Sequence, residues 1–325
     1  MISYYRISHN GGAKMEVSNK QLSLNQKKTH KKNIFLGTLF ALSAGVLWGL
    51  GGICAQFLFN SRGLTPQWVT TVRLIASGLT LLTIGYFKTG KDIFKIWTHK
   101  KDRFNLVLFA VFGMMSVQFT FLTAISHSNA ATTTVIQYLA PALVLIFVSL
   151  KNKKLPSIIE FVAVILSIVG VFLLVTHGDF SNLVISKIAL FWCIGAALSL
   201  TYYTIKPSSF NEKWSNYSQI GWAMLIGGLV CNIINPIWNI AGTFDIWTNV
   251  YLLAVVILGT LLPFTIYSIA VSIIGPTNAS LYSCVEPVAT AIMSVIFMGV
   301  SFEFLDWIGT SLIVSMVIIL SLKKK

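Results

Sequence analysis

Residues 156–176 read PSIIEFVAVILSIVGVFLLVT, and after Glu160 this stretch holds no charged side chain. Crossing the hydrocarbon core of a bilayer takes about 20 apolar residues in a helix. Similar stretches recur along the chain, which is 55% hydrophobic and 10% charged, with a mean hydropathy of +0.76. A soluble domain has about a quarter of its residues charged, and a disordered chain is poor in apolar residues. The composition excludes both classes and indicates an all-α polytopic membrane protein.

Ten such stretches are present, and we predict one transmembrane helix for each. The expected organisation is a disordered cytoplasmic tail over 1–33, a first five-helix repeat over 34–176, a second over 185–322 and a basic tail at 323–325. Translation could begin at Met1 or at Met15, and the sequence leaves both starts open. The ten stretches lie near 35–58, 67–87, 104–125, 128–150, 156–176, 185–205, 217–239, 250–274, 277–299 and 305–322.

The distribution of basic residues predicts the orientation of the helices across the membrane. With the N-terminus in the cytoplasm, 21 of the 24 Lys and Arg residues fall in cytoplasmic tails and loops. Only Arg62 and Lys187 then lie outside, and Arg73 is within a helix. Cytoplasmic loops of membrane proteins carry an excess of Lys and Arg. We therefore predict that both termini are cytoplasmic, and the net charge of +14 indicates a topology signal and not a nucleic-acid partner.

The two halves of the sequence match when one is shifted by 146 residues. Gly113 then meets Gly259, Pro141 meets Pro287, and Glu160 meets Asp306. Because each half holds an odd number of helices, the second half must enter the membrane upside down. Such inverted repeats place a binding site near the midplane of the membrane, between the halves. Rocking of the halves would expose this site to each side in turn.

Several motifs in this arrangement resemble the EamA branch of the drug/metabolite transporter superfamily. They are Ala44-Gly45-Val46-Leu47-Trp48-Gly49, Arg73, Tyr138-Leu139-Ala140-Pro141 and Val285-Glu286-Pro287-Val288. The resemblance spans about residues 35–322 and implies a bacterial plasma-membrane permease of ten helices. Family members usually carry a glutamate just after the fourth and ninth helices. Here those positions read Leu150-Lys151-Asn152 and Gly299-Val300, so this signature is missing.

Two ionisable residues within the predicted helices are candidates for a function. Glu286 lies about 13 Å into the ninth helix at 1.5 Å per residue, and a charge at that depth costs about 2.5–3.5 kcal/mol on insertion scales. It could hold a cation, exchange a coupling proton, or be a buried structural carboxyl. Arg73 could extend to the membrane surface or pair with Glu286.

Polar, aromatic and proline residues complete the candidate site. The prolines remove helical hydrogen bonds and free the carbonyls of Gln137 and Ser283, so they are candidate hinges or static kinks. Aromatic faces beside a carboxylate can bind an organic cation. The candidate substrate-binding residues are Trp48, Gln118, Gln137, Tyr138, Tyr202, Tyr267 and Glu286; the candidate charge pair is Glu286 with Arg73; and the candidate hinges are Pro141 and Pro287.

No cofactor or enzyme activity is expected. The sequence has no phosphate-binding glycine loop and no clustered metal ligands, so neither an ATPase nor a metal centre is indicated. The resemblance implies a secondary transporter of a small polar metabolite such as an amino acid. The alternatives are an importer of a small organic cation such as choline, and a membrane receptor or scaffold. A small-molecule substrate and the lipid bilayer are the expected partners, a proton is a candidate coupling ion, and both a monomer and a homodimer are compatible with the sequence.

Overall fold

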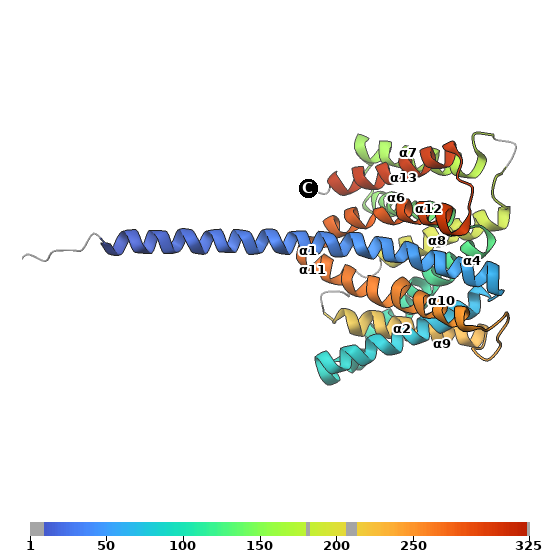
Figure 1. Ribbon diagram of the computed structural model, residues 1–325, viewed down its shortest axis with the longest axis horizontal. Coiled ribbons are helices and arrows are strands. Elements are labelled where there is room, and N and C mark those ends of the chain that lie inside the picture. Colours follow the sequence, from blue (N-terminus) through green and yellow to red (C-terminus); the bar gives the residue numbers. More distant parts are fainter. Residues whose placement is uncertain (1–9, 180–182, 206–212, 324–325) are drawn as a thin grey trace, which may run out of the picture.

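The computed structural model describes residues 10–179, 183–205 and 213–323, and this part of the chain contains helices and no strands (Figure 1). The first repeat holds α1 (Asn10–Arg62), α2 (Pro66–Thr89), η1 (Gly90–Thr98), α3 (Lys100–Leu108), η2 (Phe109–Met115), α4 (Ser116–His127), α5 (Ala130–Gln137), α6 (Ala140–Asn152) and α7 (Ile158–Thr176). The second holds α8 (Lys187–Ile205), α9 (Asn216–Ile234), α10 (Ile246–Val256), η4 (Ile257–Leu261), α11 (Leu262–Ser283), α12 (Val285–Met298) and α13 (Phe304–Lys323).

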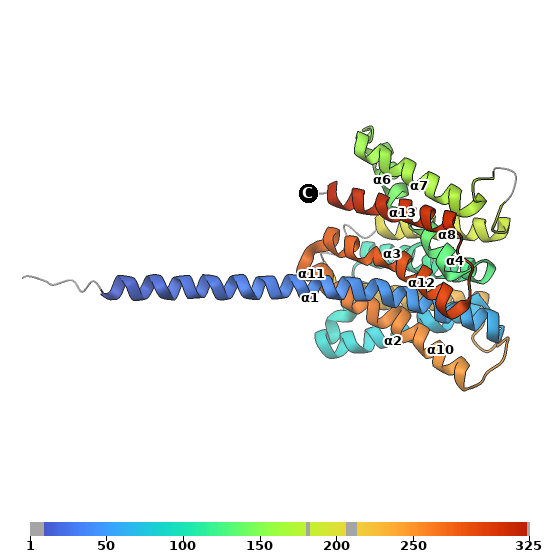
Figure 2. The ribbon, with the colours of Figure 1, turned by 45° about the horizontal axis from the view of Figure 1, so that its top comes forward.

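Elements from the two repeats are mixed within one bundle. In both ribbon views α6, α7 and α13 lie on one side, α2 and α10 on the other, and α1 and α11 between them (Figures 1 and 2). The start of α1 projects from the bundle on the side where α13 ends. We call this side the terminal face and the other side the opposite face.

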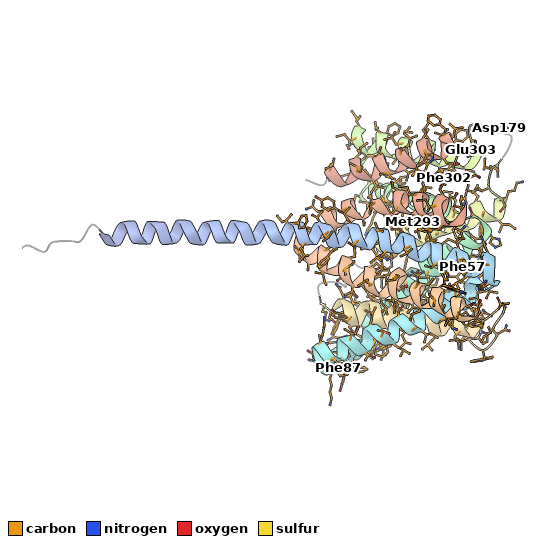
Figure 3. All side chains as sticks on the ribbon, in the orientation of Figure 1. Phe57, Phe87, Asp179, Met293, Phe302 and Glu303 are labelled. Carbon is orange, nitrogen blue, oxygen red and sulfur yellow. The ribbon has the colours of Figure 1, made fainter. Side chains whose placement is uncertain are left out.

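The bundle has the surface of a membrane protein. Nine helical segments of the described residues are long and apolar enough to cross a bilayer, and Phe304–Leu320 is a shorter apolar helix. Large apolar side chains point outward around the bundle, as Phe87 does in Figure 3, where it is 82% exposed. Ile233 and Phe191 are also exposed. A soluble monomer rarely leaves so much apolar surface in water, so lipid is the medium that this surface fits.

Short polar side chains cap the starts of two helices. Thr65 and Asn129 accept hydrogen bonds from the backbone of the first turn of α2 and α5, which satisfies N–H groups that a helix start leaves unpaired. The predicted seventh helix, 217–239, is too long, because α9 ends at Ile234. The residue before a proline disfavours helical backbone angles, and here Asn235, before Pro236, is extended.

Irregular turns occur at matching places in the two repeats. The π-helix η2 contains Gly113 and the π-helix η4 contains its repeat mate Gly259. The predicted continuous helices 128–150 and 277–299 are each interrupted, at Tyr138 and at its repeat mate Cys284. The sequence match thus corresponds to a match in local structure, since π-turns and broken helices are features that helices rarely adopt without a reason.

The acidic pair of the sequence match has a structural explanation. The Glu160 carboxylate accepts from the backbone N–H of Ser157 at 2.7 Å, and the Asp306 carboxylate accepts from that of Glu303 at 2.9 Å. Both are the reciprocal bonds of a residue three positions into a helix start. The repeat match of Glu160 with Asp306 thus reflects the same role in the first turn of two equivalent helices, α7 and α13.

The N-terminal arm differs from its expected form. We predicted a disordered tail over 1–33, whereas residues 10–33 are the first part of the continuous helix α1. Extending an existing helix by one residue is far easier than starting a new one. The membrane part of α1 supplies this start, and the arm contains good helix formers such as Lys, Gln, Glu and Leu.

Candidate functional site

Two residues from the interrupted helices meet in the bundle interior. Glu286 is in the first turn of α12 and is buried, with 9% of its surface exposed. The hydroxyl of Tyr138 lies 3.0 Å from Glu286 Oε2 and 3.2 Å from the carbonyl oxygen of Ser283. Pro287 leaves that carbonyl without its helical donor, as the sequence predicted, and Tyr138 supplies a donor. The two breaks therefore bring a phenol, a carboxylate and a free backbone carbonyl together.

Aromatic rings from α1 and α11 form a neighbouring cluster. The ring of Trp48 lies 5.3 Å from those of Tyr267 and Phe264, at 55° and 73°. Trp48 follows Gly45 by three residues on α1, and Gly45 packs against the carbonyl of Ser283 and the backbone of Glu286. Rings with exposed π faces attract cations when the charge is desolvated. A carboxylate next to aromatic rings is the combination that recognises organic ammonium groups.

A row of glycines on α1 allows α12 and η4 to approach closely. A Cβ at Gly45 would lie 2.7 Å from the Ser283 carbonyl oxygen and 3.3 Å from the Glu286 nitrogen. A Cβ at Gly51 would lie 2.4 Å from the Cα of Gly259. Gly45 and Gly51 are six positions apart, which corresponds to about 9 Å along α1 at 1.5 Å per residue. The backbone of Glu286 and the π-turn η4 are thus placed about 9 Å apart along the bundle.

Arg73 binds the π-turn directly. The guanidinium donates from Nη2 to the carbonyl oxygen of Gly259 at 2.8 Å and from Nε to the hydroxyl of Thr260 at 2.5 Å. A π-turn leaves a helical carbonyl without its usual donor, and Arg73 supplies one from α2. Among the described residues no ion pair of 4.0 Å or less joins Arg73 to Glu286. The predicted charge pair is therefore not a direct contact in this structure.

Of the other predicted site residues, some lie at the two helix breaks and some do not contact Glu286. Gln137 is buried beside Tyr138, and Pro141 and Pro287 follow the two helix breaks closely, at the start of α6 and α12. The prolines thus begin second half-helices and do not bend intact ones. Gln118 is buried in α4, and the ring of Tyr202 packs against Phe112 at 6.4 Å. Among the contacts of the described residues, none joins Gln118 or Tyr202 to Glu286.

Sequence reasoning missed several neighbours of the site. Tyr203, the neighbour of Tyr202, stacks on Phe109 at 5.2 Å and packs against a core that includes Leu74 and Met224. Only the rotation of α8 decides between two adjacent tyrosines, so no sequence signal separates them. Gly259 was marked by its repeat match, but its role as an acceptor for Arg73 depends on the π-turn. The missed residues are Tyr203, Phe264, Gly259, Thr260 and Cys284.

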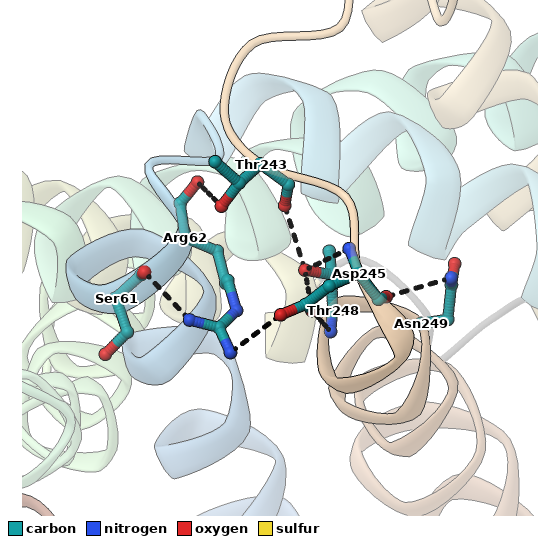
Figure 4. Close-up of polar contacts among 6 residues, drawn as sticks. All are labelled: Ser61, Arg62, Thr243, Asp245, Thr248 and Asn249. Atoms are coloured by element: carbon teal, nitrogen blue, oxygen red, sulfur yellow. Dashed lines mark hydrogen bonds and ion pairs between the residues drawn. The ribbon is translucent and has the colours of Figure 1, made fainter.

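A second polar cluster closes the opposite face, at the ends of α1 and α10 (Figure 4). Arg62 Nη2 lies 3.0 Å from Asp245 Oδ2, and the Arg62 carbonyl oxygen accepts from the Thr243 N–H at 2.9 Å. The backbone N–H of Thr248, bonded to Asp245 Oδ1 at 2.7 Å, holds the pKa of the Asp245 carboxyl below its usual range, and the Thr248 hydroxyl and Arg62 act in the same direction. Asp245 therefore joins the two repeats in its charged form.

Lipid-facing helices, a duplicated architecture and a buried polar site between broken helices define a class, that of membrane transporters built from repeats. Comparison with known proteins gives the family. The model of the EamA-like transporter family matches residues 35–176 and 187–322, so the chain belongs to the EamA-like transporter family. It is a multi-pass protein of the bacterial plasma membrane.

Individual relatives support this assignment. The chain is 39% identical over 292 residues to a Salmonella typhimurium protein described as the uncharacterized inner membrane transporter YicL, covering 89% of this chain and 96% of that protein. It is 22% identical over 298 residues to the uncharacterized transporter YwfM of Bacillus subtilis, covering 90% and 95%. A solved crystal structure shares the fold at a TM-score of 0.56 and 15% identity, covering 88% of this chain and 96% of that one.

Proposed function

We propose that this protein is a secondary transporter that moves a small polar metabolite, such as an amino acid, across the plasma membrane by alternating access. In this proposal the ten helices cross the membrane as two inverted repeats, with the terminal face in the cytoplasm. The 21 basic residues of the tails and cytoplasmic loops support that orientation. In this proposal the protein is a carrier and not an enzyme. Among the described residues no group of three or more His, Cys, Asp or Glu side chains could hold a metal ion.

One observation carries the proposal: a buried carboxylate sits at a helix break that faces the break of the other repeat. Glu286 and Tyr138 come from equivalent segments of the two repeats and lie 3.0 Å apart. Transporters bind substrates and coupling ions where discontinuous helices meet near the midplane, and intramembrane carboxylates commonly serve as proton sites. We assign Glu286 as the site for a substrate ammonium group or a coupling proton.

A second candidate is an importer of a small organic cation such as choline. The contacts that favour it are those of Trp48 with Phe264 and Tyr267, since Trp48 lies on the stretch of α1 that packs against the backbone of Glu286. A quaternary ammonium would use the aromatic faces and the negative charge together. An amino acid would in addition need a partner for its carboxylate, and Arg73, within α2, is the candidate.

Binding can separate the two candidates before transport is measured. Purified protein in detergent is heated with amino acids, with choline and related quaternary amines, and with nucleosides as a third class. A ligand of the folded state at a hundred times its dissociation constant stabilises the protein by about 2.7 kcal/mol. We expect amino acids to raise the melting temperature. A rise with quaternary amines alone would select the second candidate.

Transport is then tested in proteoliposomes with radiolabelled amino acids, choline and a pH-sensitive dye. Glu286→Gln should abolish both substrate movement and the substrate-dependent proton movement, since the amide cannot carry the charge. Glu160→Gln is the matched control, because Glu160 caps the start of α7 away from the site. Normal transport by the Glu286→Gln protein would return Glu286 to a structural role. No ligand-dependent stabilisation and no transport by the native protein would refute the proposed function.

A further inference from the structure

Bonds between the two repeats form two groups. One lies around Glu286, where Tyr138 contacts it, and at the ends of α7 and α13, where His177 pairs with Asp306 at 2.8 Å; the other lies around α1 and α2. On the opposite face, Arg62 pairs with Asp245 (Figure 4), and the indole N–H of Trp68 donates to the carbonyl oxygen of Ile237 at 2.7 Å. In the middle of the bundle, Arg73 donates to Gly259 at 2.8 Å. Each of these last three bonds joins a residue of α1 or α2 in the first repeat to a residue of α10, η4 or the segment before α10 in the second.

At the terminal face, α2, η1 and α3 of the first repeat are joined to α9 and the segment before it. The Lys88 ammonium donates to the Tyr217 hydroxyl at 2.8 Å, and Lys213 pairs with Asp102 at 2.8 Å. The carbonyl oxygen of Ile93 in η1 accepts from two residues of α9. These donors are Ser218 Oγ at 2.9 Å and Trp222 Nε1 at 3.0 Å.

The helices α2 and α9 touch through their backbones between these levels. A Cβ at Gly78 would lie 2.6 Å from the Leu225 nitrogen, and one at Gly228 would lie 2.9 Å from the Ile75 nitrogen. We call α1, α2, η1 and α3 of the first repeat, with α9, α10 and η4 of the second, the frame.

The substrate-site residues Tyr138 and Glu286 lie outside this frame. Tyr138 lies between α5 and α6, and Glu286 lies in the first turn of α12. The elements α5, α6, α7 and α13 share a core that includes Val135, Ala163 and Ile313 from both repeats, and Cys284, directly before α12, belongs to it. Within it α7 and α13 touch at their backbones, since a Cβ at Gly170 would lie 2.8 Å from the Gly309 carbonyl oxygen. We call α5, α6, α7, α12 and α13 the site unit.

Rocking of one whole repeat against the other is incompatible with bonds on both faces. A rotation of about 10° around the bilayer centre moves groups about 15 Å away by about 2.6 Å, given a hydrocarbon core of about 30 Å. Hydrogen bonds weaken steeply over such a distance. We infer that the frame stays bonded on both faces throughout transport, and that Glu286 is exposed by movement of the site unit against the frame.

This inference rests on the proposed function, and cross-linking tests it. All variants carry alanine at the four native cysteines. The frame-locked variant has cysteine at Arg62, Asp245, Asp102 and Lys213, joined on each face by a short, reducible bis-methanethiosulfonate. The border variant has Gly52→Cys with Ala130→Cys, which join α1 to α5. Their Cβ atoms lie 3.5 Å apart, a separation suited to a disulfide. The native cysteines are Cys54, Cys193, Cys231 and Cys284.

Uptake is measured with labelled amino acids and choline before cross-linking, after it, and after reduction. The frame-locked variant should transport equally in all three conditions. The border disulfide should stop transport, and reduction should restore it. Loss of uptake on locking the frame, with recovery on reduction, would overturn the inference. So would continued uptake with the border disulfide closed.

A second measurement does not depend on transport. Spin labels at Lys100 and Ile246 report the frame from one face to the other, and labels at Lys100 and Phe304 report the frame against the site unit. In lipid nanodiscs, double electron–electron resonance spectroscopy should give one narrow distance distribution for the first pair of labels. For the second pair it should give two distance populations. Two populations for the first pair would overturn the inference even if neither tracer is a substrate. Failure of the proposed function would be recognised by a different result, namely that the native protein transports neither labelled amino acids nor choline.

Discussion

Two adjacent glycines of α1 give opposite expectations for the same substitution. Gly51→Ala places a Cβ 2.4 Å from the Cα of Gly259, in the π-turn that Arg73 binds. Gly52→Ala places one 3.5 Å from the nearest atom, the Cβ of Ala130, which is ordinary contact. Both positions are within the helix, so both substitutions gain the same helical preference. Gly52→Ala is therefore a matched control for Gly51→Ala, because it makes the same exchange at the adjacent position of the same helix.

The expected magnitude follows from these distances. The Cβ at Gly51 must move by about 1 Å to reach ordinary contact, and the obstructing atom belongs to the backbone and cannot rotate away. Overpacking of this kind costs about 1–3 kcal/mol, while exchanging glycine for alanine inside a helix gains about 0.5–1 kcal/mol. Gly52→Ala should thus be neutral or stabilising by up to about 1 kcal/mol. Gly51→Ala should be less stable than Gly52→Ala by about 1–3 kcal/mol.

Unfolding in mixed micelles of dodecyl maltoside with increasing SDS, followed by tryptophan fluorescence, measures this difference. Transport should also fall in Gly51→Ala, because a displaced η4 cannot keep its bonds to Arg73. If the two alanine variants unfold at the same SDS fraction, the close approach of α1 to η4 does not exist in the folded protein. The reasoning about the glycine face would then be refuted.

Three further outcomes are expected. Single cysteines at His127 and Pro276, in a cysteine-free background, should react with an impermeant maleimide from the outside and from the inside respectively; labelling from one side would contradict the inverted repeats. Lowering the pH below about 4 should reduce the melting temperature of the native protein more than that of Asp245→Asn. This follows because the depressed pKa of Asp245 makes its contribution present above that range and lost as the pH falls through the folded-state pKa, and equal slopes would exclude the contribution. Arg73→Lys should lose about 1.5–3 kcal/mol of unfolding free energy, since one ammonium cannot reproduce the two directed bonds of the guanidinium to η4, and a variant as stable as the native protein would show that these bonds contribute nothing.

The local features of the fold were readable from the sequence. The apolar stretches place the helices, and seven of the nine long spans agree with the predicted ones to within a few residues. The exceptions are Pro66–Thr98, which continues through η1 beyond the predicted 67–87, and α9, which ends before the predicted residue 239. The match of Pro141 with Pro287 and of Gly113 with Gly259 marked the positions where helices break or form π-turns. These features depend on length, hydropathy and backbone chemistry, which each segment carries by itself.

The structure brings some of the candidate site residues together and leaves others apart. Tyr138 contacts Glu286 and Trp48 packs on Tyr267, whereas Tyr202 packs on Phe112. A buried carboxylate is informative wherever it occurs, because its cost must be compensated. An aromatic residue in a membrane helix is informative only once the rotation of its helix is known.

The partners of Arg73 and the grouping of the helices were decided by the tertiary structure alone. The sequence offered Glu286 as a partner for Arg73, but the guanidinium binds the carbonyl of Gly259, which is an acceptor only because η4 is a π-turn. The sequence also divided the chain at its repeat boundary, and the family match has the same boundary. The frame and the site unit that we infer each contain parts of both repeats, because bonds and a shared core join segments across that boundary. Length, hydropathy and repeat symmetry are properties of segments. Which backbones touch depends on packing between segments distant in the sequence, and no segment encodes that contact by itself.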